Sequence, residues 1–276
     1  KFTKEQIDEI SKNYKLLKQF YSNEIQVAIR SSAIAEDLPN ASFAGQQDTY
    51  LNITSLEELL DGTIKCFASL FNSRAISYRY TNNIKMKDIK ISVGIQKMIR
   101  SDIGSAGVAF SIDPETGYNK AIVINSAFGL GELVVSGGVT PDEYIIDKRV
   151  CKDILKDPII MKNLGNKNTK IVYGSSNKTM EIETSLIEKQ NFSIDNKDAV
   201  ELARHILSLE EYYSKLLDKD TGIDVEWALD GIDNKLYIIQ VRPETVHSNN
   251  EINKLIKYSL IQKGNILLEG VPVGEQ

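Results

Sequence analysis

A predicted β-hairpin near the C-terminal end constrains the fold of this 276-residue chain more than any other feature. Two β-rich runs, 224–228 and 237–243, flank the sequence Asp230-Gly-Ile-Asp-Asn234, which is made of residues that tight turns favour. One face of the hairpin is apolar and is predicted to lie inward; it consists of Val225, Trp227, Ile239 and Val241. The opposite face is polar and would form the floor of a site.

The polar face of this hairpin carries residues suited to chemistry. Asp224 and Glu226 lie two apart and share one side of the first strand, as Gln240 and Arg242 do on the second strand. The residue numbers of facing residues in an antiparallel pair have a constant sum. The register that sets Glu226 opposite Gln240 therefore also sets Asp224 opposite Arg242. Carboxylate and amide oxygens suit Mg²⁺, and arginine suits phosphate oxygens. The pattern indicates a metal–nucleotide site; the simpler alternative is a solvated hairpin with ordinary cross-strand pairs.

Composition narrows the class of protein. Hydrophobic residues make up 42% of the chain and charged residues 26%, which are ordinary values for one large globular domain or two. The net charge of -5 predicts neither a nucleic-acid partner nor an anionic membrane partner. Cys66 and Cys151 lack metal-ligand spacing and fit reduced thiols. The sequence has no apolar run long enough to span a membrane, so we expect a cytoplasmic protein.

Apolar periodicity and turn residues divide the chain into helices and strands. We expect helices over 4–20, 55–80 and 197–217, the last of them capped by Asp195 or Asn196. We expect strands at 26–30, 89–98, 107–112, 121–125, 143–147 and 170–173. A polar break at 248–250 precedes one more helix and a short strand that begins at 264. The sequence therefore predicts an α+β chain with a boundary near residue 248.

Three other segments could contact a nucleotide. Arg30 ends a strand and is followed by small residues whose backbone amides could help to hold a phosphate. The segment 42–49 offers glycine, amides and a hydroxyl that could close over phosphates. The run from Gln96 to Met98 could line a flat adenine at a strand edge. The alternatives are solvated loops for the first two segments and an ordinary core strand for the third.

Several familiar sites are excluded or disfavoured. The run Phe128-Gly-Leu-Gly-Glu132 lacks the third glycine of a dinucleotide fingerprint, and the chain has no P-loop sequence. The segment 113–117 is interpreted as a turn without a ligand. His205 and His247 have no neighbouring residues that would indicate nucleophilic catalysis.

Taken in order, the motifs resemble the nucleotide-binding domain of the phosphoenolpyruvate synthase family. The resemblance covers nearly the whole chain, and its first motif is the most specific. The matching segments are 27–47 (Val-Ala-Ile-Arg-Ser-Ser through Ala-Gly-Gln-Gln), 68–79, 110–117, 128–132, 140–144, 224–227 and 240–245. Pyruvate phosphate dikinase and the rifampin phosphotransferases share the domain, but 71–79, 141–144 and 242–246 are most similar to the synthase.

The resemblance implies an ATP-grasp fold and a pyruvate, water dikinase reaction. ATP would pass a phosphoryl group to a histidine on a swivelling domain and then to pyruvate, giving AMP, phosphoenolpyruvate and phosphate. Carried over by position, Glu226 and Gln240 would hold Mg²⁺ with Asp224 beside them. Arg30 and Arg242 would contact the ATP phosphates, as would Thr49 and Arg79, and Gln96, Lys97 and Met98 would line the adenine pocket.

Departures from the family pattern predict a fragment. The family begins with a Gly-rich segment bearing a phosphate-binding lysine, and the sequence has no match to it or to the phosphocarrier histidine. We expect an ATP-grasp domain over 1–247, incomplete at its N-terminal lobe, then a linker helix and the first strand of a phosphohistidine domain over 248–276. The implied partners are ATP, the phosphohistidine domain of the same full-length protein, and pyruvate through domains outside this chain; a homodimer stays open. Such a fragment should catalyse little or none of the full reaction.

Two other functions stay open at this point. The same ATP site could serve an antibiotic phosphotransferase or a pyruvate phosphate dikinase. A nucleotide-binding module without transfer activity is the alternative from another class. The presence of Asp224, Glu226, Gln240 and Arg242 argues against a decayed site.

Overall fold

The computed structural model of the chain describes residues 1–21, 25–33, 37–38, 41–42, 49–82, 84–85, 89–174 and 179–244. The expected linker helix and strand over 248–276, His247 and most of the segment 42–49 lie outside these residues. Within the described part, no helix is both long and apolar enough to cross a membrane. The chain is α+β, as its sequence predicts.

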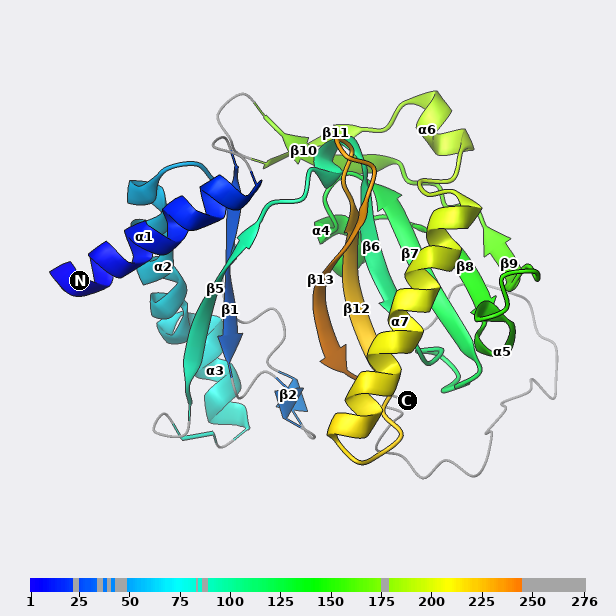
Figure 1. Cartoon of the computed structure of the whole chain (residues 1–276), viewed down its shortest axis with the longest axis horizontal. Helices are drawn as coiled ribbons and strands as arrows, with labels where there is room; N and C mark the ends of the chain where they lie inside the picture. Colours follow the sequence, from blue (N-terminus) through cyan, green and yellow to red (C-terminus); the bar gives the residue numbers. More distant parts are fainter. Residues whose placement is uncertain are drawn as a thin grey trace, which may run out of the picture.

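The N-terminal part forms a small antiparallel sheet backed by helices, shown at the left of Figure 1. The sheet has the strand order β4-β1-β5, so that β1 is central and β5 lies at an edge. Its helical side is closed by Tyr14, Val27 and Leu59, which pack together in one apolar cluster. The elements are α1 (Lys4–Tyr21), β1 (Val27–Ala33), β4 (Tyr50–Ile53), α2 (Leu56–Ala68), η1 (Ser69–Phe71), α3 (Ser73–Thr81) and β5 (Ile91–Lys97), with a two-stranded ribbon of β2 (Asp37–Leu38) and β3 (Ala41–Ser42).

The rest of the described chain builds a six-stranded antiparallel sheet, with the strand order β13-β12-β6-β7-β8-β9. Its strands are β6 (Ser105–Phe110), β7 (Ala121–Phe128), β8 (Asp142–Asp147), β9 (Ile159–Asn163), β12 (Ile223–Leu229) and β13 (Leu236–Pro243). The long helix α7 (Asn196–Leu216) lies across one face of this sheet (Figure 1). Smaller elements are η3 (Ser101–Ile103), α4 (Glu132–Val135), α5 (Lys148–Cys151), α6 (Leu186–Gln190), and the ribbon of β10 (Thr169–Tyr173) and β11 (Thr179–Glu183).

The main core lies between α7 and the large sheet. Leu202 and Ile206 of α7 are fully buried against Trp227 of β12 and Ile124 of β7. Because strand side chains alternate, burying Val225 and Trp227 beneath α7 turns Glu226 to the opposite face of the sheet. Because the apolar face of the hairpin packs under α7, its polar face lies toward the small sheet.

The expected helix over 55–80 is wrong as one unit, because the structure breaks it into α2, η1 and α3. Ser55 caps α2 in a capping box with Glu58, and this helix ends at Ala68. Asn72 has extended backbone angles and accepts a hydrogen bond from the Ala75 amide, so it starts a new helix. Continuous apolar spacing hid this cap. The predicted cap of the last helix is confirmed, since the Asp195 side chain accepts from the Asp198 amide.

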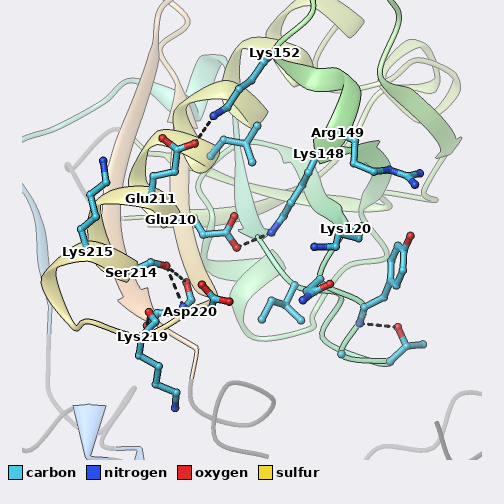
Figure 2. A pocket seen from close by; sticks show the side chains of 18 of the residues that line it. Lys120, Lys148, Arg149, Lys152, Glu210, Glu211, Ser214, Lys215, Lys219 and Asp220 are labelled. Carbon is cyan, nitrogen blue, oxygen red and sulfur yellow. Dashed lines mark hydrogen bonds and ion pairs between the residues drawn. The ribbon is translucent and has the colours of Figure 1, made fainter. Parts of the chain in front are cut away.

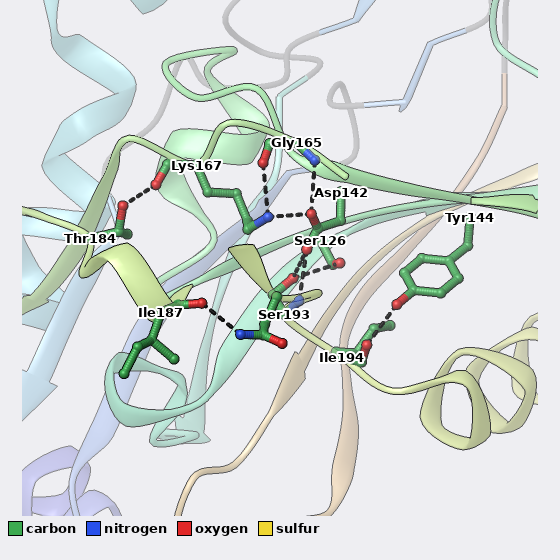
Figure 3. A network of polar contacts seen from close by, with 10 residues as sticks. Ser126, Asp142, Tyr144, Gly165, Lys167, Thr184, Ile187, Ser193 and Ile194 are labelled. Carbon is green, nitrogen blue, oxygen red and sulfur yellow. Dashed lines mark hydrogen bonds and ion pairs between the residues drawn. The ribbon is translucent and has the colours of Figure 1, made fainter. Parts of the chain in front are cut away.

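A buried polar network fixes the start of β8 (Figure 3). Asp142 and Lys167 form an ion pair in which neither side chain is exposed. Asp142 Oδ1 also accepts from the Gly165 amide at 2.9 Å, and its Oδ2 accepts from the amide and hydroxyl of Ser193 at 2.7 and 2.8 Å. Lys167 Nζ donates to the Gly165 carbonyl at 2.9 Å, and the Thr184 hydroxyl donates to the Lys167 carbonyl. This network ties the 164–168 segment and the start of α7 to the large sheet.

Candidate functional site

The hairpin has the register that the sequence predicts at its polar end. Glu226 faces Gln240 and Asp224 faces Arg242 across the β12–β13 ladder. The Arg242 guanidinium donates to Asp224 Oδ2 at 3.2 Å. The turn is closed by Asp230, whose carboxylate accepts hydrogen bonds from the Ile232 amide at 2.8 Å. Hairpin, register and polar face are therefore confirmed.

A β-bulge corrects the predicted apolar face. The register shifts between Glu226 and Trp227, so that Trp227 faces Ile238 and not Ile239. Ile238 joins the core under α7, whereas Ile239 packs with Ala106 and Ala228 on the face that carries Glu226. A bulge places two consecutive side chains on one side of a strand, which strict alternation cannot predict. Three of the four expected inward residues are correct, and Ile239 is wrong.

Arg30 reaches this floor from the other sheet. It lies on β1, and its Nη2 donates to Glu226 Oε2 and to Gln240 Oε1, both at 2.7 Å. The side chains of Arg30 and Glu226 are only 23% and 22% exposed, so the contact is largely shielded from water. One guanidinium nitrogen thus lies between the two oxygen ligands that the sequence assigns to a cation.

The three residues of the predicted adenine segment do not share one face: Gln96 and Met98 lie on the side of Ala28, and Lys97 lies on the other side. Gln96 pairs with Ala28 in the ladder and donates through Nε2 to the Ile239 carbonyl at 3.1 Å, so it faces the hairpin. Met98 is buried, packs with Ala28, and has the Tyr173 hydroxyl 3.7 Å from its sulfur. An apolar surface beside a strand edge is suited to a flat base. Gln96 and Met98 thus supply an amide and an apolar surface on the same side as Ala28, and the adenine pocket stays a prediction.

Lys97 has a different position. It pairs with Val27, whose side chain lies on the helical side of the small sheet. The Lys97 ammonium lies 4.8 Å from the centre of the Tyr237 ring, 5.3 Å from that of Tyr21, and 3.9 Å from Asp230. These contacts brace the small sheet against the hairpin turn, and the side chain does not share the face of Gln96.

The two remaining expected phosphate contacts are not brought to the hairpin. Arg79 is buried, and its Nη1 donates to the Leu70 carbonyl within the α2–α3 region. Thr49 is exposed and directly precedes β4. Within the described part of the chain, neither residue contacts Arg30 or the hairpin.

The residues present fit a hard cation in a particular way. The described residues hold no cluster of three histidine, cysteine or carboxylate side chains placed as a metal site. A cation at the hairpin would therefore take Glu226 and Gln240 as protein ligands and complete its shell with phosphate oxygens and water, as Mg²⁺ commonly does. The Arg30 nitrogen, a positive group held by the same two oxygens, is the structural observation that supports this fit.

Three residues that the sequence did not single out for the site continue the row of Glu226 across the sheet. Val108 faces Glu226, Asn125 faces Val108, and Glu143 faces Asn125. Burial raises the pKa of the Glu143 carboxyl, and the negative charges of Glu115 and Asp113 raise it further. Only the register of four strands reveals this row, so no local sequence signal could have found it.

A large groove lies on the α7 side of the sheet, away from Arg30 (Figure 2). It has a volume of about 1540 Å³ and runs between α5, the end of α7 and the 116–120 turn. Two of its lysines are paired with acids: Lys148 Nζ lies 2.6 Å from Glu210 Oε1, and Lys152 pairs with Glu211. Burial lowers the pKa of Lys148. None of the residues that the sequence predicts for the nucleotide site lines this groove.

Comparisons with known proteins find a matching family and similar proteins. Residues 1–260 match the family described as pyruvate phosphate dikinase, AMP/ATP-binding domain. The chain is 47% identical over 252 residues to the phosphoenolpyruvate synthase of Synechocystis sp., covering 91% of this chain and 31% of that protein. It is 45% identical over 279 residues to the phosphoenolpyruvate synthase of Helicobacter pylori, covering 98% of this chain and 34% of that protein. The chain thus spans about a third of the length of these relatives.

Proposed function

The chain belongs to the family of pyruvate phosphate dikinase AMP/ATP-binding domains, and from this membership we propose that it is the ATP-binding part of a phosphoenolpyruvate synthase. The observation that carries the proposal is Arg30, held from a separate sheet over the paired oxygens of Glu226 and Gln240. The synthase name of the relatives favours this function over an antibiotic phosphotransferase or a pyruvate phosphate dikinase. The fold would be an ATP-grasp fold.

The proposed nucleotide cleft consists of Arg30, Gln96, Met98, Glu226, Gln240 and Arg242, and each of these residues has a proposed role. The adenine would lie on Met98 and its apolar neighbours, with Gln96 available to its polar edge. Arg30 and Arg242 would contact the phosphates. Glu226 and Gln240 would hold Mg²⁺, which supplies positive charge to the phosphoryl group being transferred. Phosphoryl transfer depends mainly on such positioning and charge neutralisation.

The complete reaction needs more polypeptide than this chain. In the proposal, 1–247 binds ATP and Mg²⁺, 248–276 leads into a phosphohistidine domain, and pyruvate binds elsewhere in a full-length cytoplasmic enzyme. ATP, pyruvate and water would give AMP, phosphoenolpyruvate and phosphate. Purified 1–276 should therefore produce no phosphoenolpyruvate in a coupled assay, and production at an enzymatic rate would contradict this division.

The cation role is tested by replacing Glu226 with alanine. Loss of the carboxylate should weaken ATP binding at least tenfold in the presence of Mg²⁺, or about 1.4 kcal/mol, because one protein ligand is gone. Binding of ATP without Mg²⁺ should not weaken. Calorimetric titration of wild type and Glu226→Ala with and without Mg²⁺ measures both effects. Glu181→Ala, which removes an exposed carboxylate on β11, is the control; equal Mg²⁺-dependent binding by all three proteins would overturn the assignment.

A further inference from the structure

Two features of the contact between Arg30 and the hairpin indicate that it can break and re-form. A single nitrogen, Nη2, serves both Glu226 Oε2 and Gln240 Oε1 at 2.7 Å. The two partners also come from different sheets, since Arg30 lies on β1 and its acceptors lie on β12 and β13. The guanidinium therefore occupies the position of a cation and can leave it without breaking either sheet.

A second arginine in the cleft shows the contrast. Arg242 pairs with Asp224, which faces it on the neighbouring strand of the same hairpin. Both partners of that pair are therefore positioned by one ladder. The contact of Arg30 with Glu226 and Gln240 instead depends on the position of the small sheet relative to the hairpin and on whether a ligand lies between them.

Arg30 and a divalent cation cannot use the same oxygens at once. Mg²⁺ requires oxygen ligands at about 2.0–2.1 Å, and a guanidinium at hydrogen-bond distance from those oxygens would lie against it with like charge. A phosphate group changes the balance, because arginine binds phosphate through two parallel N–H bonds. Nucleotide phosphates therefore offer Arg30 a new partner and release the Glu226 and Gln240 oxygens.

We propose that Arg30 is an internal counter-ion that keeps divalent cations out of the nucleotide-free cleft and moves to the phosphates when nucleotide binds. This inference rests on the proposed function, since it assumes that nucleotide and cation meet at this floor. It makes cation binding conditional on nucleotide. By linkage, the factor by which nucleotide raises cation affinity equals the factor by which the cation raises nucleotide affinity.

The test is Arg30→Gln, a change expected to move two affinities in opposite directions. Mn²⁺ is the probe, and its binding without nucleotide is followed by the loss of the free-ion paramagnetic resonance signal. Arg30→Gln should bind Mn²⁺ alone at least tenfold more tightly than wild type, because the competing charge is gone. The same variant should bind ADP at least tenfold more weakly, because a phosphate partner is gone.

Two further variants separate charge from structure. Arg30→Lys keeps the positive charge, so Mn²⁺ alone should bind no more tightly than to wild type, while ADP should bind more weakly because the two-bond geometry is lost. Arg149→Gln removes an arginine paired with Asp147 outside the cleft, and it should change neither affinity. Circular dichroism of each variant shows whether it is folded.

The outcomes distinguish this inference from the proposed function. If Arg30→Gln is folded and binds Mn²⁺ alone no more tightly than wild type, the counter-ion role is overturned, while Mg²⁺-dependent ATP binding lost in Glu226→Ala would still support the function. If Arg30→Lys binds Mn²⁺ alone as tightly as Arg30→Gln, charge is not the cause and the role is also overturned. If Arg30→Gln does not fold, Arg30→Lys provides the test. For this variant, the ratio of the Mn²⁺ affinity with ADP to the Mn²⁺ affinity without ADP should be lower than for wild type. An unchanged ratio overturns the inference.

Discussion

Among single residues, Lys167 and Asp142 are in the most demanding environment, because both charges are buried away from water. Such a pair is kept only when further hydrogen bonds satisfy the remaining polar atoms, and Gly165 and Ser193 do so here. Lys167 also has a φ of 41°, in the left-handed region, so its backbone is held by its surroundings. The pair organises the segment before β10 without any role in the cleft.

Replacing Lys167 with methionine should lower the free energy of unfolding by about 3–5 kcal/mol, because Asp142 is left buried without its partner. Urea unfolding followed by far-ultraviolet circular dichroism measures the loss. The double variant Lys167→Met, Asp142→Asn should recover part of it, since no uncompensated charge then remains. A single variant as stable as wild type would show that the pair is replaceable.

The sequence predicts single residues correctly where the alternation of side chains along a strand is enough to fix their positions. Glu226 and Gln240 face one another because alternation and a constant sum fix them over one short ladder. Lys97 shows the limit: it follows Gln96 in sequence, so alternation sends its side chain to the opposite face of β5. The resemblance to a family names three consecutive residues as one pocket wall, whereas strand geometry allows only some of their side chains to share it.

At the scale of elements, a partly buried ion pair between Glu188 and Lys170 joins the short helix α6 to β10. Burial alone would raise the pKa of Glu188, but hydrogen bonds from Lys170 and from Ser185 lower it below the ordinary value of 4.5. A carboxylate with a lowered pKa in the folded state adds stability above its unfolded pKa, and the addition is lost as pH falls through the folded pKa. The pair thus joins α6 to β10 at neutral pH and releases it in acid.

Glu188→Gln should therefore be less stable than wild type at pH 7, by about 1 kcal/mol. The two proteins should converge as the pH falls below the ordinary carboxyl pKa of 4.5 and through the lowered pKa of Glu188, because wild type then loses the stabilisation that the variant lacks. Urea unfolding across this range checks the convergence, with Glu181→Gln on β11 as the exposed control. A constant difference at all pH values would contradict the linkage.

Element boundaries were predicted less well than element types. The break at Asn72 was missed because the apolar spacing continues across it, and only the capping side chain marks the new start. Strands β9 and β11 were missed because most of their side chains are exposed, which leaves little apolar alternation to detect. The bulge at Ile239 needed the pairing partner to be known.

At the scale of the whole molecule, three polar side chains in the described part of the small sheet contact the hairpin of the large sheet. Arg30 reaches the polar floor, Gln96 the Ile239 carbonyl, and Lys97 the hairpin turn. The first two lie on the face toward the cleft and the third on the helical face. The sequence could not predict this junction, because it joins residues about 130–210 positions apart, a separation that local pattern does not encode.

This division predicts different effects for neighbouring residues of β5. Lys97→Met should lower the free energy of unfolding by about 1 kcal/mol, because its cation–π contacts are lost, while nucleotide affinity should change less than about threefold. Gln96→Leu should instead weaken nucleotide binding by more than that. Urea unfolding and ATP titration of both variants make the comparison. Equal losses of nucleotide affinity would place Lys97 in the pocket after all.

The burial of Trp227 has an optical consequence. It is the one tryptophan of the chain, it is 1% exposed, and it directly follows Glu226 on β12. Tryptophan fluorescence therefore arises from a single point immediately beneath the floor of the cleft, on the side covered by α7. Its emission should respond when charge on the other side of the strand changes, and should shift strongly to the red when the large sheet unfolds. Trp227 is thus an intrinsic fluorescent probe that lies next to Glu226, and its emission would report whether Arg30 or a metal ion occupies the Glu226 carboxylate.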